Sequence, residues 1–347
     1  MPDAFYSIMR HSLPLFLLVL ALSACRPTGP ETPFHLQGEA QGTYYSIIYY
    51  DSLGRDLTRD LNTRLERFDH TASLWQETSE LRRVNSNITD TVSSLFADLF
   101  TMSDSIRRYT GGAFDCRVGR IVQAWGFSFR KQEELSTTTL DSLLLAARGA
   151  VSLERLPDGV FRLHKEYPAT ELDFNAIAQG YSVDLLALWF DSLGIHNYLI
   201  DIGGEVIAKG SKPGNLPWSV GIERPAADRY SRPEVEIAIR LEDGSVVTSG
   251  SYRKYYERDG TRYSHTIDPA TGRPVEHSLL SASVVSKHSW YADAMATAFM
   301  VMGLEKAIQF IANHPDNADI QAACFIYDDH GEYRTYVTPE FQKLIIE

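Results

Sequence analysis

Hydrophobic residues recur at the three- and four-residue spacing of an amphipathic helix in two early stretches of the chain. They are Leu57, Leu61, Leu65 and Phe68, and then Leu95, Leu99, Met102 and Ile106. Side chains at this spacing share one face of a helix, so each stretch predicts a helix with one buried face.

Other stretches are short and rich in β-branched and aromatic residues, which is typical of strands. They are Tyr44 to Tyr50, Val160 to Leu163, Tyr198 to Ile202, Val235 to Ile239, Leu280 to Val285 and Ala322 to Tyr327. Turn sequences occur at Asp158-Gly159, Asp259-Gly260 and Asp329-His330-Gly331. Tight turns of this kind join antiparallel neighbours. The pattern predicts an α+β fold whose mixed sheet is largely antiparallel, with packed helices.

The N-terminus has a different pattern. Arg10 and His11 precede the apolar run Leu13 to Leu22, which leads into Ser23-Ala24-Cys25. The run is about half of the roughly 20 residues that a membrane-spanning helix needs. It resembles a bacterial lipoprotein signal with Cys25 as the lipidated residue, although a buried helix ending in a cysteine is the alternative.

These features divide the chain into three predicted parts. Residues 1–25 form a signal peptide, residues 26–33 a polar, proline-containing tether, and residues 34–347 one domain. Cys116 and Cys324 then remain, and export permits a disulfide between them without requiring it. Cys324 lies in an apolar run and is interpreted as a buried small hydrophobe.

Composition limits the possible functions. The chain has 347 residues, of which 44% are hydrophobic and 22% charged, as in a globular protein. Its formal net charge of -12, without a dense Lys/Arg cluster, disfavours nucleic acid as a partner.

The segment from Ser289 to Gly303 has a helical pattern in which Asp293 and Thr297 stand four residues apart. On a helix these two side chains face the same way, and their oxygens suit Mg²⁺. The alternative is structural, with Asp293 favoured near a helix start and Thr297 bonded to a backbone carbonyl.

His265 precedes Asp268-Pro269-Ala270-Thr271-Gly272, which reads as a type I turn and needs no function by itself. A histidine at a strand end beside that turn has a suitable pKa for proton transfer.

Several further segments could approach a phosphate-bearing cofactor through glycine backbone or a helix N-terminus. They are Gly111 to Asp115, Asp201 to Glu205, Thr248 to Ser251 and Glu171 to Asp184. Each could equally be a turn, a bulge or a helix cap, and none matches the dinucleotide fingerprint or the P-loop.

Taken in order, these segments resemble the ApbE family of FAD:protein FMN transferases. The resemblance covers Gln41 to Gly303 and is carried by Gln41-Gly42-Thr43-Tyr44, Gly112-Ala113-Phe114-Asp115, Asp173 to Tyr181, Ile202-Gly203-Gly204, Thr248-Ser249-Gly250, His265 to Pro269 and Asp293 to Thr297. It implies a single domain of that family's fold.

The resemblance also implies residue roles. Side chains of Asp293 and Thr297 would hold Mg²⁺, with backbone carbonyls of Ala176 and Ala296. The flavin contacts would fall on Gln41, Trp75, Ala113, Phe114, Asp115, Asp173, Gln179 and Ile267, and His265 is the candidate base. Gln41 stands where the family usually has Met, Gln179 where it often has Lys, Trp75 where it commonly has Tyr and Cys116 where it often has Thr. Loss of the Lys is expected to tune FAD affinity without abolishing activity.

The implied reaction is Mg²⁺-dependent transfer of FMN from FAD to a Thr or Ser hydroxyl of an acceptor flavoprotein, with release of AMP. The acceptor is expected to be a subunit of a membrane electron-transport complex or another exported flavoprotein, and the enzyme to be lipid-anchored on the periplasmic or extracytoplasmic side of a cell membrane. Two alternatives stay open, namely an FAD pyrophosphatase that gives FMN and AMP, and a non-catalytic flavin-binding lipoprotein.

Overall fold

The computed structural model describes residues 32–346, apart from 131–132, 134, 158, 226–233, 252–254, 259–260, 315–318 and 321. The predicted signal peptide with Cys25, most of the tether, Asp158 and the Asp259-Gly260 turn lie outside the described residues.

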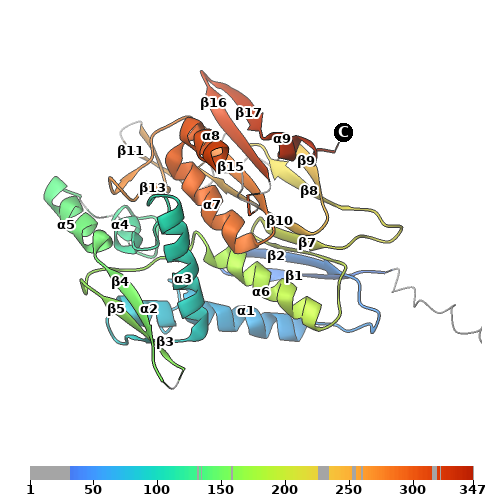
Figure 1. Cartoon of the computed structure of the whole chain (residues 1–347), viewed down its shortest axis with the longest axis horizontal. Coiled ribbons are helices and arrows are strands. Elements are labelled where there is room, and N and C mark those ends of the chain that lie inside the picture. Colours follow the sequence, from blue (N-terminus) through green and yellow to red (C-terminus); the bar gives the residue numbers. More distant parts are fainter. Residues whose placement is uncertain are drawn as a thin grey trace, which may run out of the picture.

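A central antiparallel sheet organises the described chain (Figure 1). Its eight strands are, in spatial order, β1 (Phe34–Ala40), β2 (Thr43–Tyr49), β6 (Tyr198–Ile202), β7 (Glu205–Lys209), β10 (Gly244–Gly250), β15 (Leu279–Ser286), β16 (Ala322–Asp329) and β17 (Glu332–Val337). Every pairing within it is antiparallel. The predicted α+β class with a largely antiparallel sheet is therefore confirmed.

Smaller sheets surround the central one. They are β3 (Thr91–Val92), β5 (Phe161–Lys165) and β4 (Val151–Arg155); the hairpin of β8 (Trp218–Glu223) and β9 (Val235–Leu241); and the pairs β11 (Tyr255–Arg258) with β12 (Thr261–Ser264) and β13 (Ile267–Asp268) with β14 (Arg273–Pro274).

The described helices lie mainly beside the central sheet (Figure 1). They are α1 (Thr58–Ala72), α2 (Glu80–Asn85), α3 (Ser94–Tyr109), α4 (Gly119–Ala124), α5 (Thr137–Arg148), α6 (Ala178–Ser192), α7 (Ser289–Met302), α8 (Leu304–Asn313) and α9 (Pro339–Gln342). None of them is both long and apolar enough to cross a membrane.

The two predicted amphipathic helices are α1 and α3. In α1 the expected residues Leu61, Leu65 and Phe68 are buried. In α3 the buried face is displaced slightly, because Phe96 and Phe100 are buried with Leu99 and Ile106 while Leu95 and Met102 are only partly covered. All six predicted strands are also present, with ends that differ from the prediction by at most two residues.

Alternating residues of the central strands bury both faces of the sheet. On β10, Val247 packs in the cluster that contains α7, whereas the adjacent Val246 packs with Trp218 of β8. Helices therefore cover one face, and the β8–β9 hairpin with α9 covers the other.

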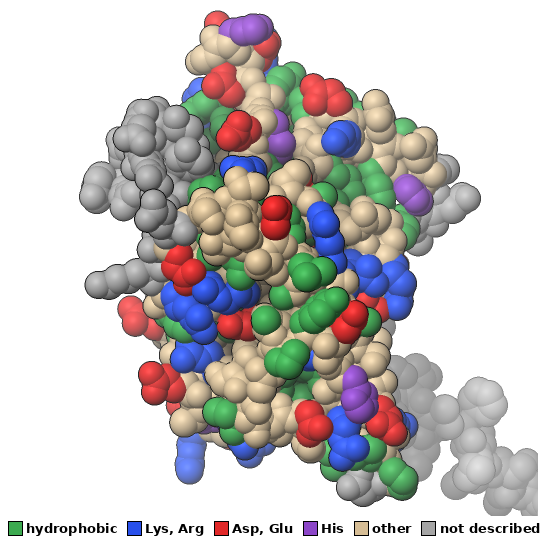
Figure 2. Space-filling model, turned by 90° about the vertical axis from the view of Figure 1, so that its left-hand side faces the viewer, with side chains coloured by type: hydrophobic (Ala, Val, Ile, Leu, Met, Phe, Trp, Pro, Cys, Tyr) green, Lys and Arg blue, Asp and Glu red, His purple; other side chains and the backbone are tan. Residues whose placement is uncertain are grey.

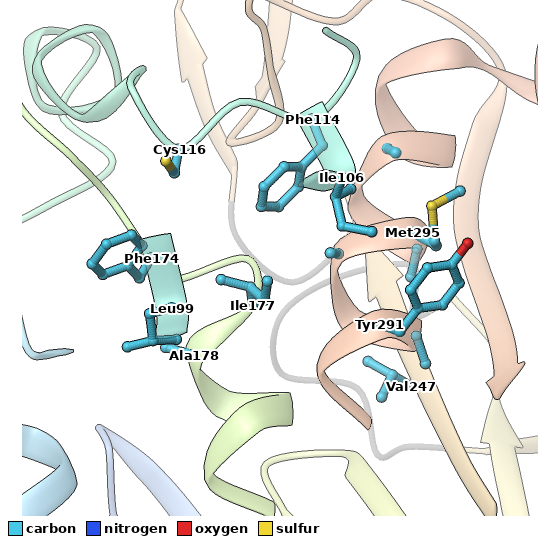
Figure 3. Close-up of a cluster of buried hydrophobic side chains, with 14 of the residues drawn as sticks. Leu99, Ile106, Phe114, Cys116, Phe174, Ile177, Ala178, Val247, Tyr291 and Met295 are labelled. Carbon is cyan, nitrogen blue, oxygen red and sulfur yellow. The ribbon is translucent and has the colours of Figure 1, made fainter. Parts of the chain in front are cut away.

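The largest cluster of buried hydrophobic side chains ties α3 and α7 to the segment before α6 (Figure 3). Phe114, Phe174 and Ile177 lie in it, together with Tyr291 and Met295 of α7. Chain segments that are distant in the sequence are thereby fixed beside one another, and the functional residues lie next to this core.

Cys116 and Cys324 are both buried and free, which agrees with the interpretation of Cys324 as a small core hydrophobe. Burial raises the pKa of the Cys116 thiol far above its usual range and that of Cys324 to about 12. Neither thiol is in the thiolate form at neutral pH, so neither is a ready nucleophile.

The outer face shown in Figure 2 mixes acidic and basic side chains, with hydrophobic side chains in small separate groups. Neither sign of charge dominates this view.

Candidate active site

A cavity of about 580 Å³ opens between the α6–α7 helix pair, the residue 113–118 segment and the strands β6, β7, β8 and β10. Its volume is in the range of small-molecule sites. Ten of the residues predicted from the sequence line it: Ala113, Phe114, Asp115, Asp173, Ala176, Gln179, His265, Ile267, Asp293 and Thr297.

Asp293 reaches the cavity where α6 and α7 cross. The residue is 4% exposed, and its Oδ2 accepts a hydrogen bond of 3.1 Å from the backbone N–H of Gly180. A methyl group at Gly180 would lie 2.5 Å from the carbonyl oxygen of Ser289. Glycine is required here because the two helices approach too closely for a side chain.

The carboxylates of Asp293 and Asp184 at this crossing have no positively charged partner among the described residues. Burial raises the pKa of the Asp293 carboxyl, and the neighbouring Asp184 raises it further. Neither carboxylate forms an ion pair with any residue that the structure describes. A buried carboxylate without a positive partner is unfavourable, so a cation fits this place.

The donor set around Asp293 suits a hard cation that binds oxygen. Thr297 follows one turn later on α7, and its hydroxyl lies 3.2 Å from Ser249 Oγ on β10. Ala176 lines the same cavity. The described residues contain no group of three or more His, Cys, Asp or Glu that could hold a metal, so a site here depends on hydroxyl and carbonyl oxygens beside one carboxylate.

The Ala176 loop is bonded to the residue 113–118 segment. The backbone N–H of Asp173 donates to the Cys116 carbonyl at 2.7 Å, and Asp173 Oδ1 accepts from the Asn175 N–H at 2.8 Å. Ala178 then begins α6 by donating to the Phe174 carbonyl. These bonds fix Ala176 at the start of the helix that crosses α7.

The segment after α3 presents three predicted flavin contacts. Its backbone turns at Gly111 and Gly112, where φ is 61° and 91°. Phe114 then packs into the core, while the Asp115 carboxylate pairs with Arg117 at 2.6 Å. The segment is therefore held from both sides and forms a preformed wall.

Gln179 stands beside these groups with an unused donor. Its Nε2 atom is buried and has no hydrogen-bond partner among the residues that the structure describes. A methyl group at Gly203 would lie 2.5 Å from this atom, so the β6–β7 turn also approaches it closely. A buried N–H donor at a cavity wall suits a ligand oxygen.

His265 lies on another wall, between β12 and β13, and is partly exposed. Its ring meets Phe127 edge-on with 6.4 Å between centroids. The following β13–β14 hairpin is closed by Gly272, whose N–H donates to the Asp268 carbonyl at 2.8 Å and whose carbonyl accepts from Trp125 Nε1. Ile267 packs between α4 and α5, so the hairpin is anchored next to the histidine.

Three predicted site residues lie outside the cavity lining. Gln41 sits in the β1–β2 turn with φ of 55° and donates to Ser182 Oγ at 2.8 Å. Trp75 is 65% exposed and contacts the edge of the Phe129 ring. Ala296 is fully buried within α7. Their roles stay predictions.

Sequence reasoning missed one wall of the cavity altogether. Residues 219–223 of β8 line it, together with Leu199 and Val206. The alternating pattern of Trp218, Val220 and Ile222 could have predicted a strand there. Nothing in that pattern would have indicated a ligand.

Comparison with known proteins finds a matching family and similar enzymes. The model of the ApbE family matches residues 41–322. The FAD:protein FMN transferase of Vibrio cholerae is 35% identical over 307 residues, covering 86% of this chain and 90% of that protein. The enzyme of the same name from Escherichia coli K12 is 32% identical and covers 90% and 89%.

Solved structures of flavin transferases are similar to this chain over most of its length. The flavin transferase ApbE from Vibrio cholerae superposes with a TM-score of 0.77 at 30% identity, covering 90% of this chain and 99% of that one. The apo flavinyl transferase ApbE of Pseudomonas stutzeri has the same TM-score and identity and covers 90% and 96%.

Proposed function

The chain belongs to the ApbE family, and on this premise we propose that it transfers FMN from FAD to a Thr or Ser hydroxyl of an acceptor flavoprotein and releases AMP. The observation that carries the proposal is the meeting of Asp293, Thr297 and His265 around one cavity, with Asp293 lacking an ion-pair partner among the described residues. A carboxylate and a hydroxyl that suit a cation thus face the same space as a potential base.

FAD would occupy this cavity with its flavin half against the residue 113–118 segment. Ala113, Phe114, Asp115, Asp173 and Ile267 all line the cavity. The unpartnered Nε2 of Gln179 would donate to an oxygen of the diphosphate or the ribityl chain. A neutral donor at this position replaces the positive charge of the family's common Lys.

Mg²⁺ fits the place between α6 and α7. The side chains of Asp293 and Thr297 and the backbone carbonyls of Ala176 and Ala296 would hold it. When bound, the ion neutralises the diphosphate and makes its phosphorus more electrophilic. This assignment explains why a buried carboxylate without a positive partner persists at the crossing.

His265 would act on the acceptor. A ring nitrogen accepts the proton of the attacking hydroxyl, whose oxygen forms a bond to the FMN phosphorus. The bond between that phosphorus and the bridging oxygen breaks, and AMP leaves with the bridging oxygen. The remaining residues contribute chiefly by holding the reacting groups in position.

The sequence pattern around Cys25 supports a lipid anchor on the extracytoplasmic side of a membrane. The acceptor would accordingly be an exported flavoprotein or a subunit of a membrane electron-transport complex. A lipid with two acyl chains on Cys25 would anchor the protein stably without a spanning helix.

The test is to incubate the detergent-solubilised full chain with FAD, Mg²⁺ and a candidate acceptor, and to look for a fluorescent flavin band that survives denaturation. Covalent flavin on the acceptor, lost when its Thr or Ser is replaced by Ala, supports the proposal. Release of free FMN and AMP without a labelled acceptor would instead assign a pyrophosphatase. FAD binding without turnover would assign a flavin-binding protein.

A further inference from the structure

Helix α7 starts without a cap of its own. The residue at its N-cap position, His288, makes no side-chain hydrogen bond to the first turn. The cap comes from α6, where Asp184 accepts from the backbone N–H groups of Ser289 and Trp290, each at 2.9 Å. A carboxylate from one helix therefore satisfies the first turn of another.

This is a costly way to cap a helix. Asp184 is 7% exposed and forms no ion pair among the described residues, and burial raises its pKa to about 7. A Ser or Asp at the N-cap position would satisfy the same N–H groups locally, without burying a carboxylate between helices. Capping alone does not account for the arrangement.

A further hydrogen bond joins the same two helices, with its donor on α6 and its acceptor on α7. Four residues before Asp184, the N–H of Gly180 donates to Asp293, which lies four residues after Ser289. The two helices are thus joined by two sets of polar bonds that are one turn apart on each. Two such points fix both the sliding and the rotation of α7 relative to α6.

Other contacts at this crossing are less directional. Gly180 has no side chain, and a methyl group there would lie 2.5 Å from the carbonyl oxygen of Ser289 and 2.9 Å from Cβ of Asp293. Small apolar surfaces permit close approach without selecting one register. The polar bonds therefore supply the register.

Building on the proposed function, we infer that Asp184 is a positioning residue for the cation site. By tying the first turn of α7 to α6, it sets where Asp293 and Thr297 stand relative to Ala176 at the start of α6. Groups that orient metal ligands in this way typically change metal affinity by about 10- to 100-fold when they are replaced.

The test measures binding of Mn²⁺ to the full chain with FAD present, through the electron paramagnetic resonance signal of free Mn²⁺. We expect about 10-fold weaker binding in Asp184→Asn, which keeps one acceptor oxygen, and about 100-fold weaker binding in Asp184→Ala, which keeps none. Both variants remove the same charge. Equal weakening in the two would mean that only the charge matters and would overturn the positioning role.

Thr338→Ala is the matched control for lost capping. Thr338 is also buried and accepts two backbone N–H bonds, from Ala323 and Phe341, on the opposite face of the sheet. We expect this variant to lower Tm and leave Mn²⁺ affinity unchanged. A similar loss of Mn²⁺ affinity in Thr338→Ala would overturn the inference by showing that general destabilisation is enough.

Asp293→Ala separates this inference from the proposed function. Mn²⁺ binding that survives Asp293→Ala would overturn the cation site itself. Binding that is lost in Asp293→Ala and unchanged in both Asp184 variants would overturn the positioning role alone.

Discussion

Two buried carboxylates in this protein have opposite surroundings. Asp51, in the loop after β2, is 2% exposed and accepts from Arg55 Nε at 2.7 Å, and this bond lowers its pKa to about 2. Asp293 is 4% exposed, and burial raises its pKa. The first carboxylate has its positive partner within the fold, whereas the second has none among the described residues. Low solvent exposure thus accompanies a stabilising ion pair in one region and leaves room for a cation in the other.

Replacing the carboxylate of Asp293 should have the largest effect. Asp293→Asn keeps the side-chain volume and an acceptor for Gly180 but removes the charge, so we expect FMN transfer to fall by about 1000-fold as several kcal/mol of charge stabilisation is lost. The measurement is the initial rate of acceptor flavinylation over a range of Mg²⁺ concentrations.

Asp51→Asn is the control for that variant, since it also removes a buried negative charge. Its transfer rate at 25 °C should stay within about twofold of the original. Equal rates for Asp293→Asn and the unsubstituted chain would contradict the contrast between the two carboxylates.

His265 lines the same cavity as Asp293 but lies on a different wall. We expect His265→Ala to slow transfer by about 100-fold through loss of general-base catalysis, while FAD and Mn²⁺ affinities change little. Single-turnover flavinylation, combined with equilibrium titration of FAD, separates these effects. Unchanged transfer would remove His265 from the mechanism, and lost Mn²⁺ binding would place it in the cation site instead.

Replacing Asp51 should lower the free energy of unfolding, by an amount that depends on pH. Its lowered pKa means that the carboxylate stabilises the folded state above pH about 4, and that this contribution is lost as pH falls through about 2. Asp51→Asn should therefore cost about 2 kcal/mol at pH 7, allowing for the partial exposure of Arg55.

Urea denaturation of the original and Asp51→Asn proteins between pH 2 and pH 7 measures this difference in the free energy of unfolding. The two curves should converge on the acid side. A difference that stays constant across the range would show that the Asp51–Arg55 pair does not supply the stability.

The smallest expected effect concerns Gln179. Gln179→Lys adds a positive charge where the described cavity wall has a neutral donor, and should tighten FAD binding by about fivefold, or about 1 kcal/mol, at low salt. Fluorescence titration of FAD at low and high salt checks this, and Gln179→Met controls for side-chain length. Equal affinities for Lys and Met variants would place the diphosphate away from Gln179.

Most of the fold could be predicted because periodicity is a local signal. The strand from Tyr198 to Ile202 has the expected bounds, and the helix around Leu61 and Leu65 buries the expected side chains. The displaced buried face of α3 could not be predicted, because Leu95 and Phe96 are equally apolar. Packing against Phe174 decides between them.

The candidate site was partly predictable for a different reason. Individually, Asp293 and His265 could each be structural, and only their order along the chain together with the other segments indicated a shared site. The β8 wall and the link from Asp184 to Ser289 escaped prediction because they join residues far apart in the sequence. Such long-range pairings depend on how the helices and strands pack.

A crystal structure of the full chain grown with FAD and Mn²⁺, with diffraction measured near the manganese absorption edge, tests the central claim most directly. The account predicts an anomalous peak within about 2.5 Å of Asp293 and Thr297 oxygens, beside the diphosphate of FAD. A manganese peak elsewhere, with FAD bound and no ion at Asp293, would contradict it.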